Sequence, residues 1–135
     1  MSAVYPKSKE LLLEYFLAGT TPSSVTFCAI GVNNTYTYNA SHQTLVSVPG
    51  GSITAPEAEL ESVSILTGGI LDADDVLFGD LDNGDEIVAT IIYAKWGGGN
   101  LLFAYIDEST DDSLPQTVTG NQAQINWNTS GIFKL

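Results

Sequence analysis

The residues best suited to chemistry form an acidic segment between positions 72 and 86. Carboxylates on a loop that also holds a glycine can coordinate Ca²⁺, and paired carboxylates can hydrolyse glycosides. The candidate cation ligands are Asp80, Asp82 and Asp85, but their spacing to Gly84 does not match an EF-hand loop. Asp, Asn and Gly are also turn formers, so residues 82–85 are more simply interpreted as a turn between strands.

The single histidine, His42, directly follows Ser41. A serine nucleophile needs a histidine side chain that converges with it, an orienting acid and an oxyanion hole. Neighbouring residues of an extended chain point to opposite faces, so we expect a surface or hydrogen-bonded loop histidine. Cys28 is the only cysteine, and its apolar surroundings predict a small buried side chain that forms no intrachain disulfide.

The glycine-rich run at residues 97–99 is the only candidate for a phosphate-binding loop. It precedes a predicted strand rather than a helix, and no Lys followed by Ser or Thr comes after it, so we interpret it as a hairpin tip. The sequence therefore predicts no cofactor, no catalytic residues and no enzymatic activity.

Composition excludes several classes of partner. The chain has 135 residues, with 16 Asp and Glu against four Lys and no Arg, for a net charge of −12. Such a charge repels phosphate backbones and anionic lipids, so we expect no nucleic-acid and no membrane partner. No apolar run resembles a signal peptide or a membrane span, so we expect a soluble protein that is made in a cytoplasm.

Residues 6–18 are predicted to form the one helix. Pro6 suits the first helical position, and Gly19 supplies a stop. A helix of this length is too short to be stable alone, so its apolar stripe should cover another part of the protein. Apolar residues recur on it at helical spacing: Leu12, Leu13, Phe16 and Leu17.

The body from about residue 24 to residue 135 is predicted to consist of short β-strands separated by Gly, Asn, Asp and Pro. This pattern predicts a mainly β single domain over residues 1–135, an antiparallel β-sandwich or barrel with one N-terminal α-helix. The predicted strands cover residues 25–30, 35–38, 44–48, 59–66, 76–78, 87–96, 100–107, 124–127 and 132–135.

Aromatic and aliphatic side chains near the helix, the glycine tip and the C-terminus are candidates for a protein interface, where such residues concentrate. Core packing is the competing interpretation for each of them, and it is the favoured interpretation for Phe133 and for Trp127. The interface candidates are Leu12, Phe16, Trp96, Ile132 and Phe133.

Several runs in the second half of the chain resemble a family of small virion proteins of tailed bacteriophages. Family members read like DADDVTF, GDTVEAVVIYK, LIAYID and a terminal IFKL or IFRL. The similar runs here are residues 71–78, 84–93, 101–107 and 131–135, and the segment from Tyr5 resembles the family's opening helix. The likeness spans nearly the whole chain and departs at residues 20–25 and 96–99.

The resemblance implies a structural component of the virion, which we place on the outer capsid surface as a cement or decoration protein made in the cytoplasm of a bacterial host. Its expected partners are the major capsid protein and other copies of itself, with a trimer favoured over a dimer. The alternatives are a tail or neck component, a host-surface or glycan-binding module, and a hydrolase that uses the acidic segment. A glycan binder should gather aromatic side chains in an exposed groove, whereas a cement protein should carry an apolar self-association surface.

Overall fold

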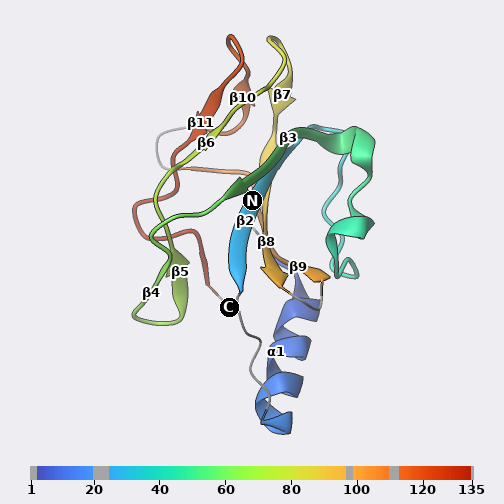
Figure 1. Ribbon diagram of the computed structural model, residues 1–135, viewed down its shortest axis with the longest axis vertical. Helices are drawn as coiled ribbons and strands as arrows, with labels where there is room; N and C mark the ends of the chain where they lie inside the picture. Colours follow the sequence, from blue (N-terminus) through green and yellow to red (C-terminus); the bar gives the residue numbers. More distant parts are fainter. Residues whose placement is uncertain (1–2, 20–24, 97–98, 110–112, 135) are drawn as a thin grey trace.

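The computed structural model describes residues 3–19, 25–96, 99–109 and 113–134 (Figure 1). The protein is mainly β with antiparallel sheets and one α-helix near the N-terminus, as predicted. The elements are β1 (Ala3–Val4), α1 (Pro6–Ala18), β2 (Thr26–Val32), η1 (Leu45–Ser47), η2 (Gly50–Ser52), β3 (Ile53–Glu59), β4 (Ser64–Leu66), β5 (Ile70–Asp72), β6 (Val76–Phe78), β7 (Glu86–Ile87), β8 (Ala89–Trp96), β9 (Gly99–Ile106), β10 (Gln116–Thr117), β11 (Ala123–Ile125) and β12 (Phe133–Lys134).

A five-stranded antiparallel sheet in the order β1-β9-β8-β2-β3 forms the centre of the protein. Its middle strand, β8, is buried from Ala89 to Ala94, because both faces of the sheet are covered. Ile92 points into one core cluster, while Ile91 and Tyr93 point into another on the opposite face. Two-sided burial explains why this strand reads as a continuous apolar run rather than as an alternating one.

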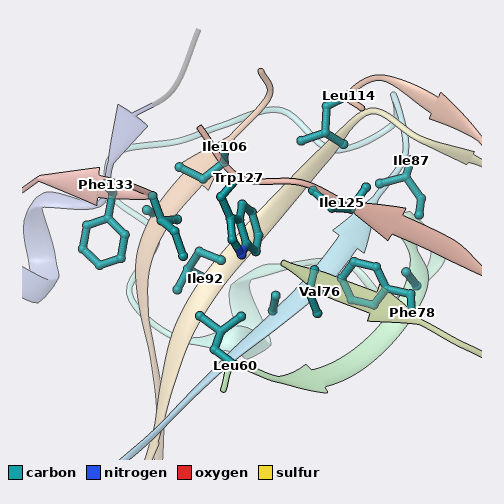
Figure 2. Close-up of a cluster of buried hydrophobic side chains, with 14 of the residues drawn as sticks. Leu60, Val76, Phe78, Ile87, Ile92, Ile106, Leu114, Ile125, Trp127 and Phe133 are labelled. Atoms are coloured by element: carbon teal, nitrogen blue, oxygen red, sulfur yellow. The ribbon is translucent and has the colours of Figure 1, made fainter. Parts of the chain in front are cut away.

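Three small sheets supply the residues that cover one face of the central sheet: β10-β7, β11-β6 and β12-β5-β4. Their side chains form the larger cluster, in which Trp127 is 6% exposed (Figure 2). The indole N–H of Trp127 donates to the backbone oxygen of Asp74 at 3.0 Å, so the polar atom of this buried ring is satisfied. The expectation that Trp127 belongs to the core is confirmed.

The segment from Asn33 to Ser52 supplies the cover for the other face. Strands were expected at residues 35–38 and 44–48, and both predictions are wrong. Tyr36 and Tyr38 are anchored by hydroxyl hydrogen bonds, to Tyr5 and to the backbone of Val4, rather than by a strand ladder. Residues 45–47 and 50–52 form 3₁₀ turns. Aromatic content favours a strand, but the phenol groups give the chain another way to attach.

The strand predicted over residues 59–66 is broken. Strand β3 begins earlier, at Ile53, and ends at Glu59, and β4 starts only at Ser64. Ser62 lies between them with φ 55°, a backbone conformation that a strand does not accommodate. The short strands β1, β5 and β10 were not predicted, because two or three residues are too few to show a periodic pattern.

The helix α1 follows the prediction in both bounds. Pro6 is its first residue, and Gly19 ends it in the left-handed region at φ 69°, with its N–H bonded to the carbonyl oxygen of Phe16 at 3.2 Å. The helix extends from one end of the central sheet, opposite the two loops at residues 79–85 and 118–122 (Figure 1).

Candidate functional site

An apolar groove lies at the α1 end of the protein and has a volume of about 340 Å³. It opens where the larger core cluster is left uncovered between α1 and the β4–β5 hairpin. Its size falls at the lower end of the roughly 300–1,000 Å³ range of ligand pockets. The residues that line it are Leu12, Tyr15, Val25, Phe27, Ile65, Gly69, Leu71, Ala94, Trp96, Leu101, Phe103 and Phe133.

Aromatic contacts build the floor and one wall of this groove. On the floor, Phe27 meets Phe103 edge to face with ring centroids 5.3 Å apart, and Phe103 lies 6.0 Å from Phe133. On the wall, Tyr15 of α1 meets Trp96 at the end of β8 at 5.3 Å and 89°. Edge-to-face pairs of this kind fix ring positions, so the wall is held in place by α1 and the sheet together.

Next to the groove, α1 presents an apolar stripe to solvent. Leu13, Phe16 and Leu17 occupy positions i, i+3 and i+4 and are 64%, 84% and 85% exposed. The expectation that the whole stripe covers the body is therefore wrong in the isolated chain: of its four residues, only Leu12 packs against the core. The helix buries a different face, since Ser8 is buried and bonds to the backbone oxygen of Tyr5 at 2.7 Å.

Three of the five interface candidates, Leu12, Trp96 and Phe133, line the groove, and Phe16 is the most exposed aromatic beside it. Ile132 and Phe133 are only 6% and 8% exposed and pack in the larger core cluster. The structure thus brings Leu12 and Trp96 together at the α1 end of the protein, and it places Ile132 in the core. Ile65, which reaches the same groove from β4, was not singled out in the sequence.

The acidic segment forms a turn. The N–H of Asp85 bonds to the carbonyl oxygen of Asp82 at 3.2 Å, and the backbones of Gly84 and Asp85 bond to that of Val118 at 2.9 and 2.7 Å. Within the described ranges, no three His, Cys, Asp or Glu side chains gather in a way that could hold a metal ion, and this covers Asp80, Asp82 and Asp85. The turn interpretation of residues 82–85 is confirmed.

His42 lies in a hydrogen-bonded loop, as expected. Its Nδ1 atom is 2.9 Å from the hydroxyl of Tyr36, which in turn lies 2.6 Å from the hydroxyl of Tyr5. Ser41 bonds instead to the side chain of Asn39 at 2.7 Å, so the serine and the histidine do not form a nucleophile–base pair. Burial raises the pKa of Tyr5 and of Tyr36, which keeps both phenols protonated in this chain of bonds.

A polar cluster surrounds Cys28 on the opposite face of the sheet. Burial raises the pKa of the Cys28 thiol to about 12, and a hydrogen bond to Glu57 adds to the effect. Burial acts to raise the pKa of Glu57 as well, but hydrogen bonds from Lys95, Cys28 and Tyr93 outweigh it and leave the pKa below its ordinary value. Lys95 Nζ lies 3.1 Å from both carboxylate oxygens of Glu57. A thiol with a raised pKa is a poor nucleophile, so the cluster is suited to structure.

Charge is distributed unevenly around the groove. Lys7 and Lys9 lie on α1, and Lys134 follows the groove residue Phe133, whereas Lys95 is paired with Glu57 in the cluster around Cys28. On α1 itself two lysines balance two glutamates, so the net charge of −12 is carried by the rest of the chain. The helix itself therefore adds no net charge to this acidic protein.

Comparison with known proteins adds no relative. No family model matches the chain, and no curated protein matches it. Within the described ranges, no helix is both long and apolar enough to cross a membrane. The apolar groove and the exposed stripe of α1 are the features that point to a contact with another molecule.

Proposed function

We propose that this protein is a non-enzymatic virion component of a tailed phage, a decoration or cement protein that binds the outer surface of the major capsid protein shell. The observation that carries the proposal is the apolar α1 end of an otherwise acidic β-rich chain. Large apolar patches of this kind mark contacts with other proteins. Five of the nine exposed large apolar side chains among the described residues lie there: Leu13, Phe16 and Leu17 on α1, and Val25 and Ile65 in the lining of the groove.

The runs that resemble the phage family support the proposal because they build the fold. Residues 71–78 form β5 and β6, and residues 131–135 contain β12, which pairs with β5 through Phe133 and Leu71. Residues 84–93 and 101–107 contribute β8 and β9, the two strands at the centre of the sheet. Proteins that share a structural role are expected to share the segments that form their sheets and core. The resemblance lies in such segments and assigns no catalytic residue.

Avidity supplies the physical basis for acting on an assembled shell. A protein that contacts two or more capsid subunits gains affinity, because the second contact is intramolecular once the first has formed. Such a protein binds a lattice tightly through contacts that are individually weak, and it binds free subunits poorly. A net charge of −12 keeps unbound copies apart in solution.

A tail-associated, glycan-binding module is the second candidate, because Tyr15 and Trp96 present aromatic rings to the groove. Sugars stack on aromatic rings but also require polar partners for their hydroxyl groups. The groove is lined almost wholly by apolar side chains, which favours an apolar protein surface over a sugar.

Heating phage heads with and without the protein tests the proposal. We expect heads that carry it to release their DNA at a higher temperature than heads that lack it, and we expect it to sediment with shells but not with free capsid subunits. Equal rupture temperatures, or equal affinity for shells and for free subunits, would overturn the capsid assignment. Binding to host-surface glycans with no binding to shells would favour the second candidate.

A further inference from the structure

We propose that the outer edge of β4 accepts an extended apolar segment of a capsid subunit as an additional strand. This binding mode rests on the proposed function, which supplies the capsid shell as the partner. It adds the part of the protein that binds and the conformation of the segment that is bound. Three features of the described residues support it: an unpaired strand edge, an uncovered row of apolar side chains, and acidic residues at one end of that edge.

The first feature is the edge itself. Strand β4 is the outermost strand of the sheet β12-β5-β4, and within the described ranges it pairs with β5 alone (Figure 1). The N–H of Gly69 bonds to the carbonyl oxygen of Leu66 at 3.2 Å, so the backbone of Leu66 faces the inside of the hairpin. Backbone groups alternate in direction along an antiparallel strand, so the N–H and the carbonyl of Ile65 point away from β5. These are the groups to which a further strand bonds.

The edge of β4 lacks the features that protect other edges. The central sheet ends in β3, which carries Pro56 and the exposed residues Glu57 and Glu59. Proline removes a backbone donor and charged side chains discourage pairing, so the β3 edge is protected. Strand β4 consists of one Ser, one Ile and one Leu, all exposed, with neither proline nor charge. Such an edge is a template for a strand of another chain.

The second feature is a row of apolar side chains across this sheet. Phe133 of β12 pairs with Leu71 of β5, and Leu71 pairs with Ile65 of β4, so the three side chains lie on one face. All three line the apolar groove. Phe133 and Leu71 are 8% and 4% exposed, whereas Ile65 is 68% exposed. An apolar residue placed opposite Ile65 on an added strand extends the row and covers its uncovered end.

The third feature is charge, which specifies the kind of segment that fits. Glu61 and Asp74 lie near the start of β4, where the N–H of Asp74 bonds to the carbonyl oxygen of Glu61 at 3.0 Å. Asp72 is the partner of Ser64 across the β4–β5 pair. The lysine of this sheet, Lys134, lies in β12 on the other side of β5. We therefore expect the bound segment to carry a Lys or Arg at the Ser64 end, next to its apolar residue.

Co-sedimentation of the full chain with capsid shells of the same phage tests the proposal. Ile65→Pro removes the outward N–H together with the side chain, and proline is tolerated where the N–H of an edge strand faces solvent. Ile65→Ala is the matched control, because it removes the side chain but keeps the N–H. We expect Ile65→Pro to bind shells at least about tenfold more weakly than Ile65→Ala, since a carbonyl of the bound strand then lacks its donor.

Leu77→Ala controls for the loss of any exposed apolar side chain. Leu77 is 54% exposed and lies in β6, outside the groove, so this variant should bind shells as the unaltered protein does. Circular dichroism and melting temperatures check that the variants remain folded.

Hydrogen exchange provides a measurement that needs no variant. In the unaltered protein, exchange of the fragment that contains Ile65 should slow when shells are added, because its outward N–H becomes bonded. Exchange of the fragment that covers β3 should not change, since that edge is protected.

The outcomes separate the strand addition from the proposed function. Equal shell binding by folded Ile65→Pro and Ile65→Ala would overturn the strand addition but leave the capsid assignment in place. Unchanged exchange around Ile65 in shell-bound protein, or slowing at β3 instead, would do the same. An unaltered protein that does not bind shells would overturn both.

Discussion

The side-chain carboxylate of Asp75 accepts a hydrogen bond from the backbone N–H of Trp127 at 2.9 Å, and it joins two segments that lie 52 residues apart in the chain. The neighbouring backbone oxygen of Asp74 accepts the indole N–H of the same tryptophan. Two residues of the acidic segment thus hold the ring that Figure 2 shows within the larger core cluster. The carboxylate of Asp75 and the backbone of Asp74 thus contribute to the fold.

Asp75→Ala should therefore destabilise the protein by about 1–2 kcal/mol, because it leaves a partly buried N–H without its charged acceptor. Urea unfolding followed by tryptophan fluorescence measures the change. Asp82→Ala is the control, since Asp82 is an exposed residue of the same segment, and it should stay within about 0.5 kcal/mol of the unaltered protein. Equal losses from the two substitutions would contradict this role for Asp75.

The cation hypothesis for the acidic turn has its own test. Replacing Asp82 and Asp85 together by Asn should cost no more than about 1 kcal/mol, because the turn is held by backbone bonds to Val118. The melting temperature should be the same in excess Ca²⁺ and in chelator, for the double variant and for the unaltered protein. A calcium-dependent melting temperature that the double variant loses would restore the cation interpretation.

The sequence predicted the parts of the fold that depend on local pattern. Pro6 and Gly19 bound α1, and long apolar runs mark β2, β8 and β9. It could not predict the groove, because Leu12, Ile65 and Trp96 come from three distant segments and meet only through tertiary packing. Helical periodicity identified the stripe, but it could not reveal that α1 extends past the sheet and leaves Phe16 exposed.

The wrong strand predictions have a similar origin. Residues 35–38 have β-branched and aromatic side chains, yet Tyr36 and Tyr38 attach through their hydroxyl groups to Tyr5 and to the backbone of Val4. Such bonds depend on where the N-terminal segment lies, which no local pattern encodes. Local preference for a strand is a weak guide when distant partners offer other contacts.

Among the glycines that the structure describes, Gly131 combines a positive φ with a close neighbouring side chain. Its φ is +115°, and a Cβ atom there would lie 2.3 Å from Ile70 Cγ2. Gly131→Ala should cost about 2–4 kcal/mol through strain and overpacking together. Gly68→Ala should lower stability by about 1 kcal/mol, because Gly68 has φ +93° but open space around it. Gly50→Ala should change stability little, because Gly50 has open space around it and no positive φ. Thermal unfolding of the three variants should follow this order.

Thr90 offers a stabilising substitution. It is fully buried in β8, and its hydroxyl has no hydrogen-bond partner among the described residues. Thr90→Val removes an unsatisfied polar atom while keeping the β-branched shape, and it should stabilise the protein by about 1 kcal/mol. Thr54→Val is the control: its hydroxyl donates to the backbone oxygen of Glu86 at 3.0 Å, so removing it should bring no gain. A loss of stability for Thr90→Val in urea unfolding would contradict the prediction.

Cys28 should make stability fall at alkaline pH. Burial raises the pKa of its thiol from 9.0 to about 12 in the folded protein, so the folded state keeps a proton that the unfolded state releases. The contribution is fully present below pH 9 and is lost as pH rises toward 12. Between pH 8 and 9.5 the loss from Cys28 should be about 0.8 kcal/mol. Burial also raises the pKa of Tyr5, Tyr36, Tyr93 and Tyr105, which together should add about 0.6 kcal/mol over the same range, given an ordinary tyrosine pKa near 10. Free energies of unfolding at the two pH values measure the sum, and Cys28→Ala should remove about half of this difference even if the substitution lowers stability at both. An equal difference in the variant would show that the alkaline loss comes from other groups.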